Sequence, residues 1–175
     1  NFLGIIRLVE KHRTSLFRSL KRNGIDFSTK TKSELVSQLF ESAFYNHFND
    51  KNISIERAGS DSLKPDILFS DTNTPLEIKT TKGEYWIGGS YSKREGDFLL
   101  VSWGEVNKKP TYFVTHVKLG KDDWADQGDK FYGTKFTKKD LLKNETKTIL
   151  MGGLSETDGK IKMIKESIMD LVKKK

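Results

Sequence analysis

The spacing of the apolar residues changes near residue 50, and this change limits the folds open to the chain. Up to that point apolar residues recur at helical intervals, which predicts a helix over residues 2–22 and a second helix that begins at Thr31 or Ser33 and ends within residues 49–52. Beyond it, apolar residues alternate with polar ones or fill short β-branched and aromatic runs. About five strands are therefore predicted, over residues 53–59, 66–69, 76–80, 97–106 and 110–119. Helices followed by strands favour an α/β fold with a mixed central β-sheet flanked by helices.

The chain has 175 residues, enough to bury a core, and no linker divides it. We predict a single domain over residues 1–175, with an N-terminal helical segment at 1–30 and the core at 31–120. The C-terminal region, 121–175, is predicted to be irregular, with a short helix at TKKDLLKN and a closing helix from residue 160. An apolar stripe on that closing helix either covers the core or forms a dimer seam; it consists of Ile161, Ile164, Ile168 and Leu171.

The charge balance favours a polyanionic partner. Lysine and arginine number 31 against 24 aspartates and glutamates, a formal net charge of +7. The absence of cysteine excludes disulfides, thiolate zinc sites and a cysteine nucleophile. No apolar run approaches the roughly 18 residues of a membrane span, so we expect a cytoplasmic protein without membrane association.

Three ionisable residues lie in a predicted β-hairpin: Asp66 follows Pro65, and Glu77 and Lys79 flank Ile78 ten residues further on. A symmetric pairing about the turn predicts that Asp66 lies opposite Lys79. Because alternate residues of a strand share a face, Glu77 and Lys79 are expected to project together with Asp66.

Two carboxylates on one face repel each other unless a cation neutralises them. Mg²⁺ is suited to this, since it takes one or two carboxylates and keeps other positions for water and phosphate oxygens. A metal-bound water is acidified and can attack phosphorus, and a lysine beside it stabilises the charge that develops. The alternative is a surface hairpin on which Asp66 and Lys79 form an exposed ion pair of little energetic value.

The pattern Pro65-Asp66, ten residues, Glu77-Ile78-Lys79 resembles the motif of the PD-(D/E)-x-K nuclease superfamily. The resemblance covers residues 31–106 in the order of elements. It implies a restriction-endonuclease-like core and a DNA endonuclease that depends on Mg²⁺, which Mn²⁺ can replace. By this resemblance Asp66 and Glu77 are metal ligands, Lys79 is the catalytic amine, and a glutamate of the preceding helix, Glu41 or alternatively Glu34, completes the site.

By the same resemblance the expected role is that of a sequence-specific type II restriction endonuclease that cuts double-stranded DNA as a homodimer. Two alternatives stay open. One is a structure-selective nuclease of the same fold, such as a junction resolvase or a repair nicking enzyme. The other is a basic DNA-binding module without catalysis, which would bind with a steep salt dependence.

Basic residues beside the hairpin are candidate DNA contacts. Lys64 and Lys82 bracket the motif, and Ser92, Lys93 and Arg94 lie in a predicted glycine-rich loop over residues 81–96. Arginine and lysine contact phosphates and guanine edges. The alternative for these five residues is ordinary solvated surface charge.

Overall fold

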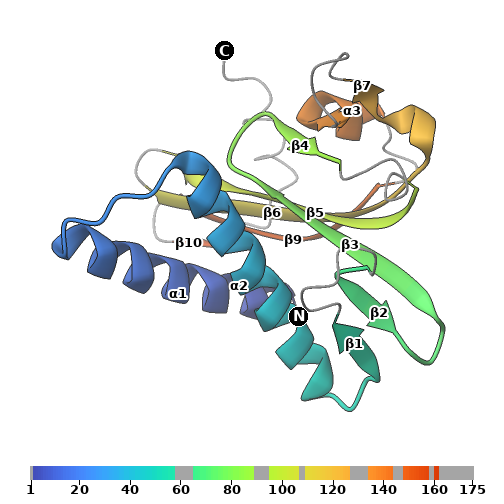
Figure 1. The fold of residues 1–175 in the computed structure, drawn as a ribbon, viewed down its shortest axis with the longest axis horizontal. Coiled ribbons are helices and arrows are strands. Elements are labelled where there is room, and N and C mark those ends of the chain that lie inside the picture. The colour runs from blue at the N-terminus through green and yellow to red at the C-terminus, as the bar shows by residue number, and fades with distance from the viewer. Residues whose placement is uncertain are drawn as a thin grey trace.

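The computed structural model describes residues 2–57, 65–88, 95–106, 109–126, 134–143, 148–157 and 160–161. Within these ranges the chain forms three α-helices, a short 3₁₀-helix at Lys121–Asp123 and ten strands (Figure 1). The helices are α1 (Phe2–Arg22), α2 (Thr29–Asn49) and α3 (Lys138–Lys143). The strands are β1 (Ile55–Arg57), β2 (Ile67–Phe69), β3 (Thr74–Thr81), β4 (Tyr85–Ile87), β5 (Gly96–Val106), β6 (Lys109–Leu119), β7 (Ala125–Asp126), β8 (Thr134–Thr137), β9 (Thr148–Thr157) and β10 (Lys160–Ile161).

Two sheets are present in the described part of the chain. The larger has seven strands in the order β1-β2-β3-β5-β6-β9-β10, and the smaller has the order β4-β8-β7. In the larger sheet β3 and β5 are parallel and the other neighbours are antiparallel, so the sheet is mixed. The predicted mixed α/β class is confirmed.

The central sheet has a core on each of its faces, because its strands alternate as predicted. On one face Leu99, Val101 and Trp103 of β5 pack in a cluster with α1 and α2. On the other face Phe98 and Leu100 pack in a second cluster with the small sheet and α3. The helix pair and the small sheet therefore cover opposite faces of β5.

The predicted hairpin exists, but its register differs from the prediction by two residues. Ile67 pairs with Leu76 and Phe69 pairs with Thr74. This register brings Asp66, just before β2, level with Glu77 rather than with Lys79. An even shift keeps each side chain on its face, so the predicted common face of the three residues survives the correction. The turn is shorter than predicted, because β3 begins earlier and only four residues, Ser70 to Asn73, separate the two strands. The centre of the hairpin therefore lies one residue closer to β2, which accounts for the shift.

Other local predictions need correction. Ser28, not Thr31 or Ser33, is the N-cap of α2, and its Oγ accepts a hydrogen bond from the Thr31 amide at 3.1 Å. The predicted loop over 81–96 contains β4. The described residues of the region 121–160 include regular elements, because β9 pairs with β6 in the central sheet and α3 matches the predicted short helix. Residues 160–161 form β10 rather than the start of a helix; the rest of that predicted helix and its stripe lie outside the described residues.

Candidate active site

The site lies where β3 extends beyond the residues that pair with β2. β2 pairs with only the first three residues of β3, Thr74 to Leu76, while β5 pairs along the other edge as far as Thr81. Within the described residues, the edge of β3 from Glu77 onward therefore faces no strand on the β2 side. A hollow of about 600 Å³ opens there between α2, β3 and β4. We call it the carboxylate groove; it is lined by Thr29, Lys30, Ser33, Glu34, Ser37, Glu41, Asp66, Ile78, Lys79, Thr80, Thr81, Lys82, Gly83, Tyr85 and Ile87.

Asp66 is fixed at this open edge by the main chain of β3. Its Oδ2 accepts a hydrogen bond from the Ile78 amide at 2.7 Å, which satisfies a donor that no strand of the described part reaches. Burial and the negative charge of Glu77 raise the pKa of Asp66 to about 6, against the opposing effects of Lys79 and the Ile78 amide, and Glu41 adds to the rise. The carboxyl therefore titrates near pH 6, and a further positive charge beside it would stabilise its ionised form.

Glu77 and Lys79 form a partly buried ion pair beside Asp66. Lys79 Nζ donates to Glu77 Oε1 at 2.5 Å, and their side chains are 21% and 10% exposed. Lys79 lines the groove, while Glu77 lies behind it and is not part of the lining. The predicted pairing of Lys79 with Asp66 is wrong as a direct contact: the lysine binds the other carboxylate and reaches Asp66 only through its charge.

Between the two candidate helix glutamates, the geometry favours Glu41. Its Oε1 accepts from Ser37 Oγ at 3.3 Å, its Oε2 lies 3.5 Å from an Arg57 guanidinium nitrogen, and its charge acts on Asp66. Glu34 also lines the groove, but its side chain is 59% exposed and lies 3.9 Å from Lys30. The hydrogen bond from Thr80 Oγ1 to the Ser33 carbonyl, at 3.3 Å, ties α2 to β3 and so sets the distance between the helix and the site.

Of the five predicted DNA contacts, the structure describes one. Lys82 is exposed directly after β3 and lines the groove, and its Nζ lies 5.7 Å from the centre of the Trp103 ring. Four others lie outside the described residues; these are Lys64, Ser92, Lys93 and Arg94.

Two groove residues on β4, Tyr85 and Ile87, were not predicted. They are 39% and 55% exposed, whereas Trp86 between them is fully buried and donates from Nε1 to the Val101 carbonyl at 2.9 Å. Lys135 Nζ lies 4.8 Å from the centre of the Tyr85 ring. The aromatic and β-branched residues Tyr85, Trp86 and Ile87 are typical of a strand, but the proximity of this strand to the hairpin depends on the packing of the two sheets.

The oxygen donors fit a hard divalent cation held by few protein ligands. No group of three or more metal-ligating side chains comes together among the residues with described positions. Asp66 lines the groove and the charge of Glu77 acts on it, and Mg²⁺ requires one or two carboxylates rather than a complete protein cage. The donor set thus fits Mg²⁺ bound together with water and substrate oxygens.

The chain matches no protein-family model and no curated protein. Among the described residues, the helices are too short or too polar to cross a membrane.

Proposed function

We propose that this protein is a Mg²⁺-dependent DNA endonuclease with a restriction-endonuclease-like core. The observation that carries the proposal is the convergence of Asp66, Glu41 and Lys79 in one open groove, from three separate segments of the chain. On an exposed surface hairpin an aspartate would keep a pKa near its ordinary value, whereas burial and the neighbouring charges raise the pKa of Asp66 to about 6. The carboxylates of Glu77 and Glu41 contribute to this rise. A group of carboxylates of this kind is suited to binding a divalent cation.

In the proposed mechanism Asp66 and Glu77 hold the metal. Mg²⁺ or Mn²⁺ held by these carboxylates would supply Lewis-acid chemistry toward phosphate oxygens and water. Asp66 would bind the metal as the carboxylate, so the proton would compete with the metal below about pH 6. Affinity for the metal therefore increases as the pH rises through about 6.

Lys79 supplies the fixed positive charge of the chain itself. The 2.5 Å contact with Glu77 orients its amine at the groove wall. An amine held at that position stabilises the negative charge that develops on the phosphoryl oxygens, at no cost of reorganisation during the reaction. Glu41, oriented by Ser37 and Arg57, provides a further carboxylate on the opposite wall.

The substrate we propose is double-stranded DNA. The net charge of +7 favours a polyanion, and exposed Lys82 lies at the groove where a phosphate would bind. The proposed role is that of a type II restriction endonuclease acting as a homodimer, whose two-fold axis would match a palindromic site.

One observation favours a second candidate, a structure-selective nuclease such as a junction resolvase or nicking enzyme. Tyr85 and Ile87 expose apolar surface inside the groove. Such surface suits unpaired bases, which stack on aromatic side chains, better than it suits a phosphate backbone.

The test compares the parent protein with Lys79→Ala on plasmid and phage DNA in Mg²⁺, with EDTA as the metal-free control. Lys51→Ala, in the exposed turn after α2, is the matched control for loss of one lysine. We expect cleavage by the parent and by Lys51→Ala, and a loss of about 100-fold or more in Lys79→Ala. Discrete fragments would support a restriction enzyme, and preference for junctions or nicked products would support the second candidate. Binding without cleavage in Mg²⁺ and in Mn²⁺ would refute nuclease activity.

A further inference from the structure

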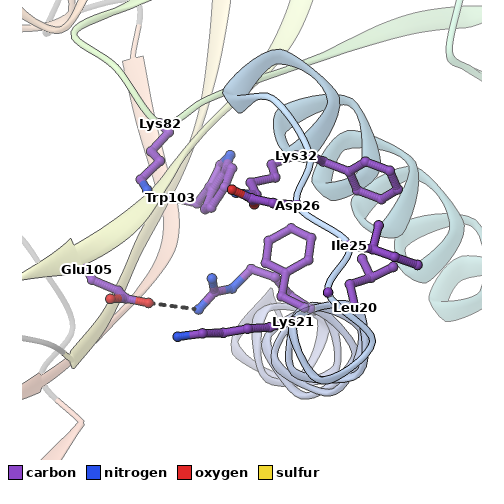
Figure 2. A pocket seen from close by; sticks show the side chains of 12 residues that line it. Leu20, Lys21, Ile25, Asp26, Lys32, Lys82, Trp103 and Glu105 are labelled. Carbon is purple, nitrogen blue, oxygen red and sulfur yellow. Dashed lines mark hydrogen bonds and ion pairs between the residues drawn. The ribbon is translucent and has the colours of Figure 1, made fainter.

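A second hollow of about 560 Å³ lies beside the carboxylate groove, at the corner between α1 and α2. Figure 2 shows Lys21 and Leu20 on α1, Ile25 and Asp26 in the α1–α2 connection, Lys32 on α2, and Lys82, Trp103 and Glu105 on the sheet side. We call it the corner pocket; it is lined by Arg13, Phe17, Leu20, Lys21, Gly24, Ile25, Asp26, Phe27, Lys32, Lys82, Trp103 and Glu105.

One part of this lining is apolar and open to solvent. Ile25, in the connection between the two helices, is 47% exposed. The lining also contains Leu20 and two phenylalanines, Phe17 and Phe27. A flat apolar ligand could pack one of its faces against this surface. Such packing would be favourable, because it would remove apolar area of the pocket from water.

The charged part of the lining has an excess of cations. Arg13 is paired with Glu105 at 3.7 Å, and Lys32 is paired with Asp26 at 2.6 Å. The remaining two cations, Lys21 and Lys82, form no ion pair with a carboxylate within the described part of the chain. An anionic group on the ligand would meet these two amines.

The corner pocket and the carboxylate groove are neighbours. Lys82 lines both of them, and α2 contributes Lys32 to one and the adjacent Ser33 to the other. A strand with its phosphate at Lys79 would pass Lys82 before it reached Lys21. A nucleotide within a strand combines the features that this lining calls for, since it has an aromatic base, an anionic phosphate and a continuing chain.

We propose that the corner pocket binds a nucleotide unit, with its base on the apolar lining around Ile25 and its phosphate at Lys21 and Lys82. The occupant is an unpaired nucleotide of the DNA strand that enters the carboxylate groove, so this part of the inference rests on the proposed function. A purely apolar ligand would leave the two amines unused, and a simple inorganic anion would leave the apolar surface unused.

The test is fluorescence anisotropy with a labelled oligothymidylate, in EDTA so that no strand is cut. Ile25→Asp places a carboxylate in the pocket, and Leu8→Asp makes the same change at a residue of α1 that is 42% exposed and outside the lining. We expect Ile25→Asp to weaken binding by about fivefold or more, the lower end for loss of a stacked base, while Leu8→Asp stays close to the parent. Lys21→Gln should lower the slope of log affinity against log salt by about 0.7, unlike Lys11→Gln on the same helix.

Competition with thymidine monophosphate separates the two sources of a nucleotide. Displacement by the mononucleotide, lost in Ile25→Asp, shows that the pocket recognises a free nucleotide as well; displacement by oligonucleotides alone shows that it needs the strand. Equal binding by Ile25→Asp and Leu8→Asp, or no binding by the parent, overturns the inference.

The outcomes for the pocket and for the nuclease are distinguishable. If the parent cleaves DNA but Ile25→Asp binds as the parent does, the pocket proposal fails and the nuclease stands. If the effect of Ile25→Asp holds but the parent never cleaves, the nuclease proposal fails and the pocket remains a nucleotide site.

Discussion

Replacing Asp66 by asparagine should stabilise the protein in the absence of metal. The pKa of Asp66 is raised from 3.8 to about 6 by burial and by Glu77, which corresponds to roughly 3 kcal/mol of unfavourable free energy for the ionised form in the folded state. Asparagine has no charge, and its Oδ1 can still accept from the Ile78 amide. We therefore expect Asp66→Asn to unfold at higher urea than the parent near neutral pH, with a gain of up to about 3 kcal/mol.

The pH dependence has a definite sign. Because the folded-state pKa lies above the ordinary value, the parent loses this stability as the pH rises from about 3.8 to about 6. The difference between Asp66→Asn and the parent should therefore be largest above the window and vanish below it. Urea unfolding in EDTA at about pH 7.5 and about pH 3, followed by the fluorescence of the buried Trp86 and Trp124, measures both.

Two controls make this measurement decisive. Asp71→Asn, at an exposed position of the β2–β3 turn, removes the same charge outside the groove and should change stability little. Saturating Mg²⁺ should stabilise the parent, by about 2.7 kcal/mol at a concentration one hundred times the dissociation constant, and should stabilise Asp66→Asn far less. A gain that is equal at both pH values, or a loss of stability in Asp66→Asn at neutral pH, would refute the assigned electrostatics.

Three further perturbations follow from the geometry. Arg13→Ala should destabilise the fold by about 3–5 kcal/mol in urea, because it leaves the Glu10 carboxylate without the guanidinium that binds it at 2.8 Å. An equal loss in Lys11→Ala would contradict this. Gly24→Ala should lower stability by about 1–2 kcal/mol, since Gly24 has a φ of +70° at the end of α1; an unchanged urea midpoint would show that the turn relaxes. Tyr85→Ala, but not Tyr85→Phe, should weaken binding of single-stranded DNA by about fivefold or more, and equal affinities would place the bases elsewhere.

The network around Glu10 stabilises a charged carboxylate, in contrast to the surroundings of Asp66. Burial opposes the charge of Glu10, but hydrogen bonds from Arg13, Thr14 and Tyr112 outweigh it and hold the pKa of Glu10 below its usual range. This contribution is present above the ordinary pKa of glutamate and is lost as the pH falls below it. The pKa of Asp66 shifts in the opposite direction, because burial and the charge of Glu77 outweigh Lys79 and the Ile78 amide.

The topology explains why the proposed chemistry is located at β3. A strand paired on both edges over its full length has no free main-chain donors, and β3 loses its β2 neighbour after Leu76. The Ile78 amide then binds the side chain of Asp66 instead of a strand. The same gap leaves room for residues of α2 and β4 to approach Lys79.

Local pattern was sufficient for α1, for the existence of the hairpin and for the common face of its charges. The period of the apolar residues predicts α1 from Phe2 to Arg22, as observed, and alternation places Ile78 in the core with Glu77 and Lys79 on the other face. This face survived a two-residue error in register, because the side-chain period of a strand is two. Such features depend on neighbours in the chain, so the residues themselves carry the information.

Long-range packing decided the rest. Which carboxylate binds Lys79, which glutamate of α2 faces Asp66 and how Tyr85 comes to line the groove all depend on contacts between segments far apart in the sequence. β9 shows the same limit, because its glycines give little strand signal and its place in the sheet is set by pairing with β6. The sequence alone determined which ionisable groups share a face of β3. The tertiary structure determined which of them are in contact and which carboxyl has a raised pKa, since these depend on burial and on distances between segments far apart in the chain.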